Sequence, residues 1–345
     1  MMNVDTKPIC IGTGLVALDV IMSGISGKVT QFLAGGSCGN VLTILAYLGW
    51  DSYPIARLSN NIAAELLLED LHRWNVTDTL LSINETGSTP VIIHRILTDR
   101  MGIPKHRFEF RNPEDGKHLP AYKPCLAKDV HKIYQTGPRP KVFFFDRINR
   151  GAIELAKLYK EAGAVIFFEP SSIKDEKGFN ECIEIADVIK FSDDRIPLYE
   201  KYFESAKVPL EIQTMGAKGL KFRMIGSSTW TYLRGYYIEN VVDSAGAGDW
   251  CTAGIIYNLF HDKTIKNLTI DEVSFALDFG QALSALNCTF EGARGLMYHF
   301  KSSELLSYIQ FIIESEDHRI LERKGTEQPE IQTAQMKISS LLARV

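Results

Sequence analysis

Short apolar runs separated by helical patterns fill the chain from about residue 130 to residue 214. The runs that predict strands lie at 132–135, 142–145, 165–168, 187–190 and 210–214. Between them, helical spacing predicts helices at 152–162, 179–186 and 196–203. Apolar runs without polar alternation are typical of parallel strands whose two faces are covered by crossover helices. The pattern therefore predicts an α/β fold, a three-layer α/β/α sandwich with a mostly parallel central sheet.

The first half of the chain carries the same alternation with two interruptions. The apolar run at 9–22 predicts one buried strand, and the segments that follow predict strands at 27–33 and 53–58 and helices at 39–48 and 63–74. β-prone segments at 90–97 and 107–110 then break the alternation, and a proline-containing stretch reaches residue 130. A stretch of this length with little regular structure is typical of a lid or a binding loop.

The end of the chain separates a folded body from a tail. Helices are expected at 250–260, 273–288 and 304–314, and a polar linker covers 322–330. Six later residues share one face of a helix, namely Ile331, Ala334, Ile338, Leu341, Leu342 and Val345. We therefore expect residues 1–318 to form the folded domain. Residues 319–345 are expected to form a C-terminal tail with an amphipathic helix that docks on the body or on a partner.

Composition narrows the classes of partner. The 345 residues are 45% hydrophobic and 23% charged, with a net charge of −4, which gives no reason to expect nucleic acid or an anionic membrane. The six cysteines are scattered without a C-x-x-C pair, a pattern typical of reduced thiols. No apolar run reaches the ~20 residues that span a bilayer, and the first residues lack the pattern of a signal peptide. We therefore expect a cytoplasmic protein.

The turn at 243–249, Asp-Ser-Ala-Gly-Ala-Gly-Asp, joins a strand-like run to the helix expected at 250–260. Its small residues permit a sharp turn and leave the backbone open to a ligand. The first N–H groups of a helix lack partners within the helix and carry partial positive charge. The turn therefore suits a phosphate group with Asp249 beside it, although a plain helix cap is an alternative. The same partial charge predicts that Asp249 is ionised near neutral pH.

Two further glycine motifs come earlier in the chain. Gly-Gly-Ser-Cys-Gly-Asn at 35–40 leads into the helix expected at 39–48, and Thr-Met-Gly-Ala-Lys-Gly at 214–219 follows a predicted strand. Taken alone, both are weak signals, because Asn40 is a common residue for a first helical turn and 214–219 also suits a tight hairpin. Asp19 adds a carboxylate inside an apolar run, where it either faces solvent at a strand end or binds a polar group.

With these motifs in this order, the chain resembles the ribokinase-like (PfkB) carbohydrate kinases over roughly residues 9–300. The resemblance implies a ribokinase-like fold with a small β-sheet lid built from about 23–34 and 88–125. It also implies that Asp249 is the catalytic base and that the 245–248 turn is the anion hole, with Gly246, Ala247 and Gly248. Substrate hydroxyls would bind at Asp19, Gly35, Gly36 and Asn40. The nucleotide would contact Ser192, Thr214, Gly216, Gly219, Ala245 and Gln281.

One place departs from the family pattern. The family's N-x-x-E residues, which help to arrange magnesium and phosphate, correspond here to Ser192 and Arg195, so a charge is reversed. Asp193 or Asp194 would substitute for them, or else forms a solvated turn. The resemblance implies ATP and Mg²⁺, with the ion bridging the nucleotide phosphates largely through water, so no protein metal ligand is assigned. The spacing of the histidines fits no zinc pattern, as seen for His94, His106, His118 and His131.

The function implied by the resemblance is transfer of the γ-phosphoryl group of ATP to a hydroxyl, most simply the hydroxymethyl group of a sugar or sugar derivative. Two alternatives stay open. A nucleoside kinase of the same superfamily would share the motifs, with Phe108 and Phe110 lining a pocket for the base. A sugar-binding protein with weakened catalysis is the other, motivated by Ser192 and Arg195. Partners would be a small sugar and ATP, and a homodimer through the lid is also open.

Overall fold

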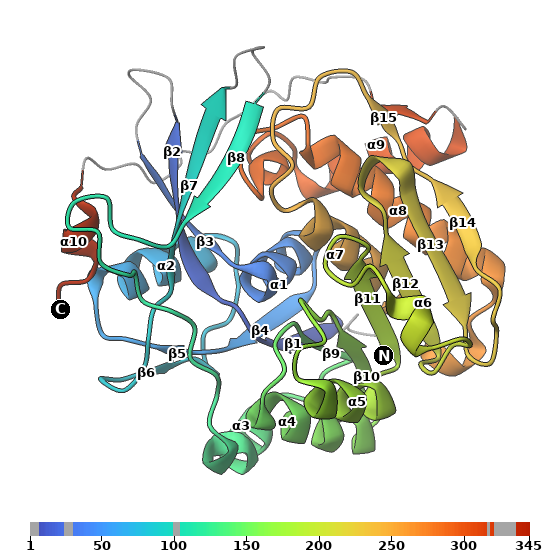
Figure 1. Cartoon of the computed structure of the whole chain (residues 1–345), viewed down its shortest axis with the longest axis horizontal. Coiled ribbons are helices and arrows are strands. Elements are labelled where there is room, and N and C mark those ends of the chain that lie inside the picture. Colours follow the sequence, from blue (N-terminus) through green and yellow to red (C-terminus); the bar gives the residue numbers. More distant parts are fainter. Residues whose placement is uncertain (1–6, 24–29, 99–103, 316–317, 321–335) are drawn as a thin grey trace, which may run out of the picture.

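The central feature of the molecule is a sheet of eight described strands in the order β14-β13-β12-β11-β10-β9-β1-β4 (Figure 1). The computed structural model describes residues 7–23, 30–98, 104–315, 318–320 and 336–345. The sheet runs from β4 to β12 in parallel and ends in two antiparallel strands, β13 and β14. Its strands are β1 (Ile9–Thr13), β4 (Asp51–Ile55), β9 (Val142–Phe145), β10 (Val165–Phe168), β11 (Val188–Ser192), β12 (Leu210–Thr214), β13 (Gly219–Met224) and β14 (Thr231–Arg234).

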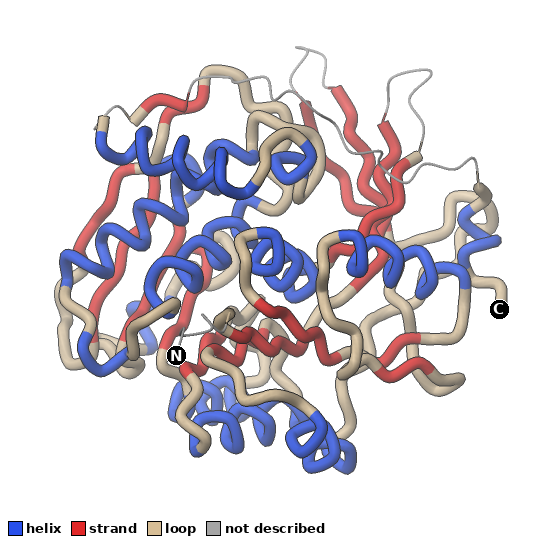
Figure 2. Tube along the Cα trace, turned by 180° about the vertical axis from the view of Figure 1, so that it is seen from behind, coloured by secondary structure: helices blue, strands red, loops and turns tan. Residues whose placement is uncertain are grey.

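Helices cover both faces of this sheet, as expected from its continuous apolar strands (Figure 2). One face packs on α3 (Val130–Thr136), α4 (Arg150–Glu161) and α5 (Glu176–Ile185), and the other on α1 (Ser37–Tyr47), α7 (Ala247–Phe260) and α8 (Ile270–Asn287). In β9, Phe143 and Phe145 belong to the first core and Phe144 to the second, and all three are fully buried. The three-layer α/β/α architecture is therefore confirmed.

A second, four-stranded sheet stands beside the central one, and we call it the lid sheet (Figure 1). Its order is β3-β2-β7-β8, formed by β3 (Gln31–Gly35), β2 (Ala17–Ser23), β7 (Val91–Thr98) and β8 (Pro104–Glu109). The expected excursions at 23–34 and 88–125 both contribute to it. It also contains β2, which the sequence pattern had placed in the central sheet.

Two expected elements are wrong and one is shorter than expected. The single strand at 9–22 is two strands in different sheets, because the chain turns at Gly14, whose added Cβ atom would lie 1.5 Å from Asp146 Oδ1. The strand at 132–135 is the helix α3, because Val130, Ile133 and Tyr134 are spaced to pack one helical face against α4. The helix expected at 196–203 is limited to α6 (Tyr199–Tyr202).

The remaining elements join the body to the segments at its ends. Helix α2 (Ile62–Arg73) packs on β3, α9 (Ser302–Glu314) packs on α8, and β5 (Arg57–Leu58) pairs with β6 (Ser82–Ile83). Beyond residue 318, β16 (Arg319–Ile320) pairs with β15 (Tyr237–Ile238), and the short helix α10 (Ile338–Leu341) contacts α2 (Figure 1). The tail positions Ile331 and Ala334 lie outside the described residues. Within the described residues, no helix has the length and apolar character needed to cross a bilayer.

Candidate active site

A cavity of about 1070 Å³ lies between the carboxyl edge of the central sheet and the lid sheet. Its walls come from the ends of β11 and β12, from the first turns of α1 and α7, and from β7 and β8 of the lid sheet. The carboxyl ends of parallel strands are the usual place for ligands in open α/β sheets. The fold therefore directs the polar residues of several distant segments into one space.

The turn before α7 is held by a carboxylate and by a glycine that no other residue replaces without strain. Asp243 Oδ1 accepts from Ala245 N at 2.6 Å, and Asp243 Oδ2 accepts from Gly292 N at 2.7 Å. Gly246 has φ 73°, and a Cβ atom there would lie 2.1 Å from the Ala293 carbonyl oxygen. These constraints bring the chain sharply into α7 and leave the turn facing the cavity.

Helix α7 begins without a side-chain cap, in contrast to several other helices of the molecule. Side chains accept from backbone N–H groups at the starts of α2, α4, α5 and α8, whereas Gly246 precedes α7. In the described part of the chain, the N–H groups of Gly248 and Asp249 donate to no acceptor. A helix start with free N–H groups and partial positive charge is an anion-binding site.

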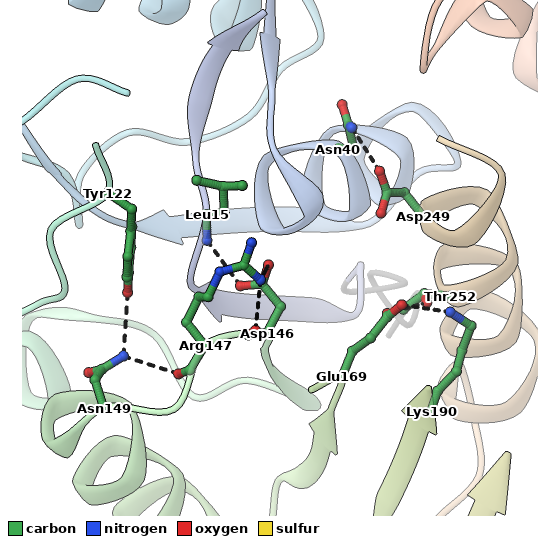
Figure 3. Close-up of polar contacts among 10 residues, drawn as sticks. All are labelled: Leu15, Asn40, Tyr122, Asp146, Arg147, Asn149, Glu169, Lys190, Asp249 and Thr252. Carbon is green, nitrogen blue, oxygen red and sulfur yellow. Dashed lines mark hydrogen bonds and ion pairs between the residues drawn. The ribbon is translucent and has the colours of Figure 1, made fainter. Parts of the chain in front are cut away.

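Asp249 stands at the wall of the cavity, directly after these free N–H groups. Its Oδ2 accepts from Asn40 Nδ2 at 2.7 Å, which joins α7 to α1 (Figure 3). Burial, and after it the negative charge of Glu169, raise the pKa of Asp249 to about 8, although Asn40 and Lys190 act in the opposite direction. The expectation that Asp249 is ionised near neutral pH is therefore wrong, because burial outweighs the favourable helix end.

At the lid side of the cavity, Asp19 is fixed between β3 and β7. A Cβ atom on Gly35 would lie 1.9 Å from Asp19 Oδ2, so the carboxylate needs a glycine at that position. Asp19 Oδ1 lies 3.4 Å from His94 Nε2 and has no hydrogen-bond partner in the described structure. Burial lowers the pKa of His94, but the Asp19 charge overcomes this and raises it above its usual value. Asp19 lines the cavity, so its carboxylate is available to a ligand there.

The opposite end of the cavity is built from the loops after β11 and β12. Asp193 N donates to the Thr214 carbonyl oxygen at 3.0 Å, so the two loops support each other. The turn after β12 is a short 3₁₀ segment, Gly216–Lys218. Gln281 on α8 is buried and lines the same region. This end of the cavity continues without a break to the turn before α7.

Comparison with known proteins identifies the family. The model of the pfkB family carbohydrate kinases matches residues 22–298. The chain belongs to this family. An ATP-dependent ribose-1-phosphate kinase from Halopiger xanaduensis is 26% identical over 263 residues, which cover 75% of this chain and 82% of that protein.

Two solved structures show the same fold. The Arabidopsis thaliana ribokinase in complex with ribose and ATP has a TM-score of 0.66 at 18% identity, covering 89% of this chain and 100% of that one. The Burkholderia thailandensis nucleoside kinase in complex with inosine has a TM-score of 0.65 at 17% identity, covering 88% of this chain and 97% of that one. The fold is therefore ribokinase-like, and the family assignment makes the protein an ATP-dependent sugar kinase.

The kinase cavity brings together nearly all of the residues that the sequence singled out. The turn residues Gly246, Ala247, Gly248 and Asp249 line it, as do Asp19, Gly36, Asn40, Ser192, Thr214, Gly216, Gly219, Ala245 and Gln281. Gly35 does not line it and instead makes room for Asp19. Among the described residues, no three His, Cys, Asp or Glu side chains gather as a metal site.

Three further cavity residues have surroundings that the sequence motifs do not indicate. Glu169 directly follows β10, and Lys190 lies within the apolar strand β11. A charged residue inside an apolar strand is the signal that would have indicated Lys190. His94 had been considered only as a metal ligand, and its place in β7 opposite Asp19 gives it a different environment.

Proposed function

We propose that the kinase transfers the γ-phosphoryl group of ATP to a hydroxymethyl group of a sugar or sugar derivative, with Asp249 as the base. The observation that carries this proposal is the position of Asp249. It follows the free N–H groups of the α7 start and lies in one cavity with the polar lid residue Asp19. A hydroxyl held between Asp19 and Asp249 lies beside the anion-binding turn.

The steps follow from what each group does. The Asp19 carboxylate would accept hydrogen bonds from substrate hydroxyls, and the Asn40 amide would donate hydrogen bonds to them. The N–H groups of the turn face the charge on the transferring phosphoryl oxygens, where fixed donors contribute most in such reactions. Asp249 takes the proton of the attacking hydroxyl as the new O–P bond forms and the bond to ADP breaks. The strands below hold these groups before the substrate arrives, so little rearrangement is needed.

We place ATP along the loops after β11 and β12 and the turn before α7. Residues Ser192, Thr214, Gly216, Gly219, Ala245 and Gln281 would contact it. Asp193 and Asp194 line the same part of the cavity, and their carboxylates suit a hydrated Mg²⁺ ion, which prefers oxygen and keeps several waters. Bound with ATP, Mg²⁺ neutralises phosphate charge. The reversed charge at Arg195 lies in this loop, so we expect a high magnesium requirement rather than independence from the ion.

The experiment is a screen for ADP release with MgATP over free sugars, sugar phosphates and nucleosides, with the Asp249→Asn variant as the blank. We expect a sugar or sugar derivative to give the highest turnover, and excess chelator to abolish it. A nucleoside that exceeds every sugar would favour the nucleoside-kinase alternative. Of the two aromatic residues invoked for a base pocket, Phe108 lines the cavity and Phe110 does not, so only one of the two supports that alternative.

We also propose that two copies pair through their lid sheets. Phe108 and Phe110 leave 49% and 58% of their surface exposed on or next to β8. Exposed aromatic pairs of this kind are enriched at protein interfaces. The molar mass in solution tests this: a dimer is expected for the wild type, and the Phe110→Asp variant is expected to be a monomer.

A further inference from the structure

Directly beneath the anion-binding turn lies a buried lysine that holds the backbone of the turn. Lys190 projects from β11, and its side chain is 2% exposed. Its Nζ donates to the Gly248 carbonyl oxygen at 3.2 Å. The N–H group of Asp249 belongs to the same trans peptide unit as this carbonyl, so it points away from Lys190. Lys190 is thus attached to the part of the chain that would stabilise the phosphoryl group.

Glu169 completes this arrangement from the neighbouring strand. Its Oε1 lies 2.7 Å from Lys190 Nζ, and its Oε2 accepts from Thr252 Oγ1 at 2.6 Å (Figure 3). Thr252 lies on α7, one helical turn beyond Asp249. The Glu169–Lys190 pair therefore connects β10, β11 and α7, and each of its charges has a fixed partner.

Stability alone gives a weak reason for such a pair. Removing two charges from water costs free energy that their attraction barely recovers, and apolar residues of similar size commonly do as well. The strands on either side are apolar and fully buried, with Phe167, Phe168, Val188 and Ile189. An ion pair in this place, directed at the active turn, is better explained by its electrostatic effect on that turn.

The charges around Asp249 come from each element that packs against it. Asn40 on α1 donates to it, Glu169 and Lys190 follow from β10 and β11, and Asp146 lies at the end of β9 with Arg147 beside it. Among these, Glu169 and Asp146 disfavour the ionised form of Asp249, and Lys190 favours it. The Glu169–Lys190 pair is close to neutral as a whole, but either member alone would change the field at Asp249 strongly.

We propose that Glu169 and Lys190 are positioning residues that hold the anion-binding turn from below and, through their opposite charges, determine when Asp249 is able to accept a proton. This inference rests on the proposed role of Asp249 as the base. Its consequence is specific. Loss of the Glu169 charge makes Asp249 ionise at lower pH, whereas loss of the Lys190 charge makes it ionise at higher pH.

The test compares Glu169→Gln, Lys190→Met and the double variant with the full-length wild type. The ionisation of Asp249 is followed by ¹³C NMR on protein labelled at the aspartate carboxyl carbon, and its signal is assigned by its loss in Asp249→Asn. We expect its midpoint to fall by about one pH unit in Glu169→Gln and to rise by about one in Lys190→Met. In the double variant, which restores a neutral pair, the midpoint should return to within a few tenths of wild type.

Thr252→Val is the matched control, because it removes the hydrogen bond to Glu169 Oε2 without changing a charge. We expect it to leave the Asp249 midpoint within a few tenths of a pH unit. A purely structural pair predicts shifts of the same sign in both single variants, or an equal shift in Thr252→Val, and either result overturns the inference.

The same variants separate this inference from the proposed function. If the NMR midpoints move in opposite directions and the acid limb of kcat/KM follows them, the result supports both the inference and the proposed role of Asp249 as the base. Opposite NMR shifts with an acid limb that stays in place mean that Asp249 is not the base, so the proposed role fails. An active kinase in which neither midpoint moves contradicts the inference alone. Glu169→Gln keeps the shape of the side chain, so the comparison holds even if Lys190→Met folds poorly.

Discussion

At the level of single residues, the proposed reaction depends on the environment of Asp249. A carboxylate with a pKa of about 8 is mostly protonated at neutral pH and must lose that proton before it accepts one from a substrate. We therefore expect kcat/KM for the acceptor to rise about tenfold per pH unit up to a midpoint near pH 8. A pH–rate profile between pH 5.5 and 9.5 checks this. A flat profile, or an acid limb with a midpoint below pH 6, would disagree with the raised pKa of Asp249.

The same residue should reduce stability at alkaline pH. An aspartate in the unfolded chain has a pKa near 3.9, so between pH 4 and pH 8 the folded protein binds the proton that the unfolded chain has lost. The free energy of unfolding contributed by this group therefore falls as pH rises through that window. The Asp249→Asn variant has no titrating group at this position and therefore lacks this pH dependence. Its side-chain oxygen can still accept the hydrogen bond from Asn40 Nδ2.

We expect thermal unfolding to occur at a higher temperature in Asp249→Asn than in the wild type above pH 8, with the difference vanishing near pH 4. A difference that is constant across pH, or that has the opposite sign, would show that the carboxylate is not held against its usual ionisation. The measurement uses scanning calorimetry at matched ionic strength, because charge effects depend on salt.

At the scale of elements, strands and helices with a single clear period were predictable and the turns between sheets were not. The strand at 210–214 and the helix at 152–162 agree with β12 and α4 because their apolar spacing allows one interpretation. In the run at 9–22, Thr13 and Gly14 stand where the chain leaves one sheet for the other, but the apolar residues on both sides also fit a single strand. Ile133 and Tyr134 favour strands locally, and the contact of α3 with α4 overrides that preference.

The site was predictable where it depended on backbone shape. Glycine turns and the carboxylate after them are visible in the sequence, since few residues fit a turn that faces a ligand. Glu169 was missed because its importance comes from the pairing of β10 with β11, which no local pattern encodes, and the charge of Lys190 in an apolar strand does not by itself identify its partner. The predicted ionisation state of Asp249 was wrong for the same reason. Residues from distant segments surround its carboxylate and raise its pKa.

The β3–α1 connection provides a prediction at this scale. Gly35→Ala places a Cβ atom 1.9 Å from Asp19 Oδ2, and Asp19 is enclosed on its other side by His94. We expect the acceptor KM to rise at least about tenfold with the KM for ATP nearly unchanged, because a misplaced positioning group costs of that order. Steady-state kinetics with each substrate varied in turn measures both constants.

Gly39→Ala in α1 is the matched control for this variant. Its Cβ atom would meet nothing closer than 3.7 Å, and alanine stabilises a helix interior by about 0.5–1 kcal/mol relative to glycine. We expect higher stability and an acceptor KM within about twofold of wild type. Equal effects of the two alanines on the acceptor KM would contradict the contact between Gly35 and Asp19.

At the scale of the whole molecule, the segments after residue 318 pack on the body at two places. β16 pairs with β15, whose two residues line the cavity, and Tyr237 N donates to the His318 carbonyl oxygen at 2.6 Å. Residues 336–345 dock beside α2, where Glu114 Oε1 accepts from Ile338 N at 2.7 Å and Ile62 N donates to the Ala343 carbonyl oxygen at 3.3 Å.

This docking predicts a clear contrast between two neighbouring leucines. Leu341 is fully buried and Leu342 only partly. We expect Leu341→Ala to lower the free energy of unfolding by about 2 kcal/mol, the lower end for a buried leucine, and Leu342→Ala to lower it by clearly less. Urea denaturation measures both. Equal, small effects would mean that the end of the chain does not pack on the body in solution.

The proposed mechanism requires Asp249 to take the proton from the attacking hydroxyl, and the turnover of the Asp249→Asn variant shows whether it does. The measurement is the rate of ADP release with MgATP and the best acceptor at pH 9, where the wild-type carboxylate is ionised, with ATP binding followed in parallel. We predict a fall in turnover of about 10²–10⁴-fold, the usual contribution of a general base, with ATP binding nearly intact. Turnover above about a tenth of wild type would contradict the mechanism.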